Sequence, residues 1–103
     1  MDVYKAANIL AESIKENDKY KELEKLNKEL LNDPDLSDEL KRFYRLQINF
    51  DGNDKQRLEE IENLKEKLLK YPKVKKYFKL ENEVNDMMGE ITNILKDSID
   101  IEF

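Results

Sequence analysis

The sequence contains no cysteine, no histidine and no tryptophan, and only two glycines and two prolines. Without cysteine there are no disulfides, thiolate metal sites, iron–sulfur ligands or thiol nucleophiles. Without histidine the chain also lacks the usual zinc ligand and the usual general base near neutral pH. So few glycines and prolines argue against a turn-rich all-β fold. Only carboxylate, lysine and hydroxyl chemistry remains.

Long apolar runs are missing as well. No stretch approaches the roughly 20 residues needed to cross a bilayer. The N-terminus has Asp2 where a signal peptide has basic residues, and no long apolar stretch follows it. We therefore expect no membrane insertion, a cytoplasmic location and one domain over residues 1–103. The 24 acidic and 19 basic residues give a net charge of −5, which argues against general coating of nucleic acid.

Apolar residues recur at helical spacing almost throughout, which predicts an all-α fold of about five helices and no strand. The first stripe covers Val3 to Ile14. Residues 16–18 then favour helix caps over helix interiors, and a second stripe runs from Tyr20 to Leu31. The region can form two helices or one kinked helix, and we favour a break near Asn17.

Two prolines mark further helix starts. Asp33 can cap a third helix that begins at Pro34, because proline fits the first turn, where its missing amide hydrogen is not needed. Pro72 repeats this arrangement, and the helix that it begins extends to about Ser98 with Gly89 as its only breaker residue. The expected architecture is therefore helical hairpins followed by a long last helix.

The fourth helix follows the turn sequence Asp-Gly-Asn-Asp at residues 51–54. Asn53 and Gln56 have the spacing of a capping box, which predicts that Asn53 caps this helix. Its apolar face is expected to consist of Leu58, Ile61, Leu64 and Leu68.

The chain also matches itself at an offset of 38 residues. Leu30 aligns with Leu68, and Pro34 aligns with Pro72, each within a helix that ends in Leu-Leu-x-x-Pro. A duplication or two independent uses of the same helix corner can produce this match. Two copies are too few for a solenoid, which needs about three.

The length and the apolar stripe of the last helix predict that the chain assembles with a partner. Some 26 residues at 1.5 Å each span about 39 Å, whereas a compact chain of this length is only about 33 Å across. Its apolar stripe is wide, and such a stripe normally finds a partner, most often a second copy. We therefore expect a dimeric bundle, a homodimer or a hetero-oligomer with a paralogue, and the alternative is that the first four helices cover the stripe. The candidate interface residues for a dimer or another protein partner are Phe78, Leu80, Val84, Met87, Met88, Ile91, Ile94 and Leu95.

Seven lysines cluster around the second proline, opposed only by Glu66. With Tyr71 and Tyr77 among them, they can contact RNA phosphates or an acidic protein. We favour the alternative of a solvated junction in which some lysines complement a helix C-terminus. The candidate basic patch consists of Lys65, Lys67, Lys70, Lys73, Lys75, Lys76 and Lys79.

The acidic clusters do not match a metal or catalytic motif. An EF-hand needs glycine at its sixth position and glutamate at its twelfth. Counted from Asp33 these positions hold Asp38 and Tyr44, and counted from Asp51 the sixth is Gln56. Helix capping explains both clusters better. We predict no catalytic residue, no metal site, no cofactor and no enzyme activity.

The order of these features resembles the YlbF/YmcA (Com_YlbF) family of small helical bacterial regulatory proteins. The likeness covers nearly the whole chain. It consists of the helix from Val3 to Ile14, Asp18–Leu23, Asn32–Leu36, Tyr71–Phe78, and the last helix with Val84, Met88, Ile91 and Leu95.

The resemblance implies a dimer-forming adaptor without catalytic activity. Named members of the family act in competence, sporulation and biofilm control, and in mRNA processing by the endoribonuclease RNase Y. Some members bind iron–sulfur clusters through cysteines, which this chain lacks, so that cofactor does not carry over. We expect a non-catalytic regulatory adaptor from a cysteine-free branch, and the alternatives are an RNA-contacting accessory protein or a purely structural assembly subunit.

Overall fold

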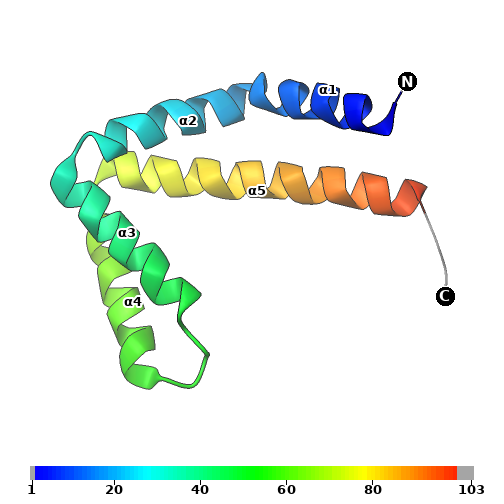
Figure 1. Ribbon diagram of the computed structural model, residues 1–103. Coiled ribbons are helices and arrows are strands. Elements are labelled where there is room, and N and C mark those ends of the chain that lie inside the picture. The colour runs from blue at the N-terminus through cyan, green and yellow to red at the C-terminus, as the bar shows by residue number, and fades with distance from the viewer. Residues whose placement is uncertain (1, 100–103) are drawn as a thin grey trace. The chain divides into compact units, whose positions relative to one another are not determined.

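The computed structural model describes residues 2–99, which form five α-helices and no strand (Figure 1). The predicted all-α fold with a long last helix is confirmed. The helices are α1 (Val3–Lys15), α2 (Asp18–Leu31), α3 (Pro34–Ile48), α4 (Lys55–Leu68) and α5 (Pro72–Ser98).

Asn17 separates the first two helices. Its side-chain oxygen accepts hydrogen bonds from the backbone amides of Lys19, at 2.9 Å, and Tyr20, at 3.3 Å. These amides have no partner within α2, so the asparagine caps the helix start. The favoured break near Asn17 is therefore confirmed, and two helices form rather than one kinked helix.

The caps of α3 and α4 differ in how well they were predicted. The Asp33 carboxylate accepts from the amide of Leu36 at 3.3 Å, and Pro34 begins the helix, as expected. The cap of α4 is Asp54, which accepts from the amides of Gln56 and Arg57 at 3.0 and 3.2 Å. The prediction of Asn53 was wrong by one residue.

The preceding turn explains this shift. Gly52 has φ +89°, a conformation that favours glycine. The amide of Asn53 donates to the Asp51 carboxylate at 2.9 Å. Because Asn53 completes the turn that Asp51 begins, the following aspartate is left to cap the helix.

The 38-residue repeat corresponds to two helix corners with the same backbone hydrogen bonds. The Leu30 carbonyl accepts from the Asp33 amide at 3.1 Å, and the Leu68 carbonyl accepts from the Tyr71 amide at the same distance. One turn later, Ser37 donates to the carbonyl of Asp33 and Lys75 donates to that of Tyr71. The sequence match therefore reflects one local geometry used twice.

The described chain divides into two compact units. Residues 24–77 form one unit, called here the core unit, which contains the end of α2, all of α3 and α4 and the start of α5. Residues 2–23 and 78–99 form the other, called the flanking unit, with α1, the start of α2 and most of α5. The assignment of residues 1–103 to one domain stays a prediction.

The core unit holds most of the buried apolar side chains. Within it, α3 and α4 lie side by side as a hairpin (Figure 1), with Arg42 and Glu60 paired at 2.8 Å across their surface. Leu58, predicted to face the core, is instead 42% exposed. The buried side chains of this unit are Leu26, Leu30, Leu36, Leu40, Phe43, Ile61, Leu64, Leu68 and Val74.

Candidate protein-interaction face

The flanking unit buries much less than the core unit. Only Leu80 and Val84 are buried apolar residues within its described part. Helix α1 buries none of its residues, although its apolar groups follow a helical stripe. A helix of 13 residues is marginal in water without packing, since isolated helices need roughly 12–15 residues even when rich in alanine. Helix α1 therefore leaves much of its apolar surface exposed.

The predicted interface residues of α5 all lie in the flanking unit, but they differ in burial. Toward the C-terminal end of the helix, Met88 is 41% exposed to solvent, Ile94 is 63% exposed and Leu95 is 48% exposed. Ile99, just after the helix, continues the series at 65%. Earlier in the helix, Leu80 and Val84 are buried, and Phe78, Met87 and Ile91 are half-buried.

Helix α1 adds apolar surface that the sequence prediction did not assign to an interface. It exposes Val3, Tyr4 and Ile9, and it belongs to the same compact unit as most of α5. The stripe was visible in the sequence, but periodicity alone does not say whether a stripe is covered by the same chain. We call the exposed apolar residues of both helices the α1/α5 face.

An ion pair links α2 and α5 within the same unit. Lys19 at the start of α2 pairs with Glu83 of α5 at 3.6 Å. Both side chains remain partly exposed, so this ion pair contributes at most about 1 kcal/mol. Packing of apolar surface, rather than this pair, must hold the helices of the unit together.

The predicted basic patch is partly neutralised by acids. Lys67 donates to the Glu39 carboxylate, and Lys73 lies 3.8 Å from Glu29. The hydrogen bond that Lys67 donates to Glu39, together with the negative charge of Glu39, raises the pKa of Lys67 above the ordinary lysine value. Because this pKa is raised on folding, the attraction operates at neutral pH and is lost as the pH rises through it.

The remaining lysines of the patch are distributed along two helices and their corner. Lys65 lies on α4, Lys70 lies in the corner, and Lys75 and Lys76 lie on α5, with Lys79 further along that helix. All five are exposed. The RNA contact and the alternative of a solvated junction both stay predictions.

One residue of each acidic cluster caps a helix. Asp33 and Asp54 cap α3 and α4. Among residues 2–99, no group of three or more acidic side chains is placed to hold a metal ion. Over the same residues, no helix combines the length and the apolar character that crossing a membrane requires.

Comparison with known proteins adds one finding. The model of the family described as "Control of competence regulator ComK, YlbF/YmcA" matches residues 3–100, nearly the whole chain. That description names a regulatory role and no chemical reaction. No curated protein and no solved structure shows significant similarity to the chain.

Proposed function

Because the chain belongs to the YlbF/YmcA family, whose role is regulatory, we propose that it is a non-catalytic adaptor that works as a homodimer. The observation that carries the proposal is the α1/α5 face. Ile94 is 63% exposed and Leu95 48% exposed on a long helix, and α1 buries nothing. Several exposed apolar side chains on two helices of one unit support an interaction role.

A second copy of the chain is the occupant that fits best. The face is apolar and carried on helices, so two copies can pack α5 against α5 about a two-fold axis and exclude water from both stripes. At 1.5 Å per residue, the 27 residues of α5 give a seam of about 40 Å. A hetero-oligomer with a paralogue would use the same residues.

The first experiment measures mass in solution by light scattering across a concentration series. The expected mass is about 25 kDa, twice the 12.4 kDa of one chain. An Ile94→Asp variant should be monomeric, because a charge in the seam would be desolvated. Ile94 is largely exposed in one chain, so this variant should still fold.

Ile48→Asp is the matched control, since Ile48 is 82% exposed at the end of α3, outside the flanking unit. It should leave the dimer intact. The half-buried Ile91 offers a second site, and Ile91→Asp should weaken both assembly and folding. A wild-type monomer at all concentrations would overturn the homodimer.

We further propose that the adaptor acts on the processes implied by its family, namely competence control and RNase Y-dependent mRNA processing. Mapping transcript ends in cells that produce the wild type or the Ile94→Asp variant would test this role. Altered ends in the variant would support it, and identical ends would contradict it.

RNA contact through the lysine patch is the second candidate. The exposed Lys65, Lys70, Lys75 and Lys79 favour it, while the pairing of Lys67 and Lys73 reduces the available charge. If these lysines neutralise phosphates, affinity should fall steeply as salt rises. Binding that is absent or independent of salt would exclude this role.

A further inference from the structure

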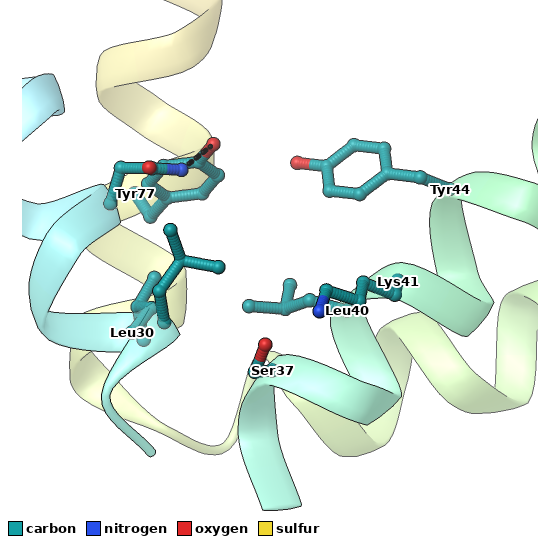
Figure 2. A pocket seen from close by; sticks show the side chains of 8 residues that line it. Leu30, Ser37, Leu40, Lys41, Tyr44 and Tyr77 are labelled. Atoms are coloured by element: carbon teal, nitrogen blue, oxygen red, sulfur yellow. Dashed lines mark hydrogen bonds between the residues drawn. The ribbon is translucent and has the colours of Figure 1, made fainter. Parts of the chain in front are cut away.

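A pocket of about 210 Å³ opens in the core unit, between the end of α2, the first turns of α3 and the start of α5 (Figure 2). Leu30 and Leu40 form much of its apolar lining. It is larger than the roughly 150 Å³ cavity that accommodates a benzene ring. The pocket can therefore hold a small ring-sized molecule rather than only a few waters.

Ser37 is the first polar feature of this pocket. The residue is only 6% exposed, and its hydroxyl oxygen points into the open space (Figure 2). Among the described residues its hydroxyl has no hydrogen-bond partner, although its backbone amide donates to Asp33. The hydroxyl is not a buried atom without a partner, so it is accessible from the pocket and can bond a polar ligand atom there.

Lys41 is the second polar feature. It follows Ser37 by four residues, so both lie on the same face of α3. Lys41 is the only lining residue that is charged at neutral pH, and its ammonium forms no ion pair within the described chain. A hydroxyl donor and an ammonium one turn apart match the two oxygens of an anion.

Two tyrosines form the opposite walls. The Asn27 amide donates to the Tyr77 hydroxyl oxygen at 3.2 Å, which ties the α2 and α5 sides of the pocket together. Tyr44 of α3 faces this pair, with its hydroxyl directed across the pocket (Figure 2). The two rings and the leucines suit a flat apolar body.

We propose that this pocket binds a small aromatic monocarboxylate of about the size of benzoate. Its carboxylate lies against Ser37 and Lys41, and its ring lies between the leucines and the tyrosines. A phosphate dianion fits less well, because one lysine and an apolar lining cannot replace its hydration. The site lies within the core unit, so the proposal does not rest on the homodimer.

The test is an NMR titration of the full chain labelled with ¹⁵N, with benzoate as the probe. Saturable shifts are expected at the amides of residues 37–44 and at Tyr77. Benzamide has the same shape without the charge and should bind about tenfold more weakly, the factor that corresponds to losing one charge-assisted hydrogen bond. Benzylamine, a cation, should not bind.

Variants assign the two polar contacts. Lys41→Met should weaken benzoate about tenfold and leave benzamide nearly unchanged. Lys25→Met is the matched control, since Lys25 is exposed on α2 and does not line the pocket. Ser37→Ala should weaken both probes. Both polar variants should fold, because neither side chain has a hydrogen bond within the described chain.

A third variant tests the volume of the pocket. Leu31 lines it but is 53% exposed, so Leu31→Trp can fill the space without disturbing buried packing and should abolish binding. Absence of saturable shifts at 10 mM benzoate in the wild type would overturn the proposal. Equal affinities for benzoate and benzamide, unaffected by Lys41→Met, would overturn it as well.

Discussion

Single side chains decide where the helices of this protein begin. Asn17, Asp33 and Asp54 each accept hydrogen bonds from backbone amides that have no partner in the first turn of a helix. Sequence pattern identified the cap at Asp33 and placed a helix break near Asn17. It missed the third, because the competing turn at Asp51–Asn53 uses the residue that the capping-box pattern selected.

The Asp54 cap leads to a prediction at this scale. Replacing Asp54 with alanine should lower the free energy of unfolding by about 1 kcal/mol, because two amides of α4 lose their acceptor. Urea denaturation followed by circular dichroism measures the change. Asn53→Ala is the control and should change stability by less, since its side chain caps nothing. A larger loss for Asn53→Ala would restore the capping-box interpretation.

The long helix α5 contains a glycine, Gly89, in its interior. It continues through Gly89 without interruption, although glycine in a helix interior costs roughly 0.5–1 kcal/mol relative to alanine. A Cβ atom placed at Gly89 meets nothing within 4 Å, and its φ is not positive. The glycine therefore has no packing role within one chain.

We predict that Gly89→Ala raises the free energy of unfolding by about 0.5–1 kcal/mol, because alanine reduces the freedom of the unfolded chain. Thermal denaturation measures this gain. Gly52→Ala provides the opposite case and should destabilise, because φ at Gly52 is +89°. Loss of stability or of dimer mass in Gly89→Ala would mean that a second chain approaches α5 closely at this position.

In the whole molecule, the buried apolar residues are distributed unevenly between the two units. Within residues 2–99, nine of the eleven buried apolar side chains belong to the core unit, and two belong to the flanking unit. Each fully buried aliphatic side chain contributes roughly 1.5–3 kcal/mol. Burial of apolar side chains therefore stabilises the core unit more than the flanking unit, and the proposed homodimer would bury further apolar surface of the flanking unit.

The proposed homodimer gives a prediction for the whole molecule. If the native state is a dimer, the apparent midpoint of unfolding should rise with protein concentration by mass action. Thermal melts at concentrations that differ a hundredfold would measure the shift. The midpoint of Ile94→Asp should be lower and independent of concentration. An unchanged midpoint for the wild type would argue that one chain is stable alone.

Sequence alone determined the local features of this protein. Periodic leucines such as Leu26, Leu30, Leu64 and Leu68 predicted the helices, and Pro34 and Pro72 predicted two of their starts, because these signals act within one or two turns of the chain. Membership of the family followed from the same ordered features.

Only the tertiary structure decided which apolar stripes are covered. Leu80 and Ile94 belong to the same apolar stripe in the sequence, yet Leu80 is buried and Ile94 is 63% exposed. The sequence likewise carried no sign that Ser37 and Lys41 would line a pocket with Tyr77, which lies far along the chain. Burial and pockets arise from contacts between distant residues, and one sequence carries no direct record of those contacts.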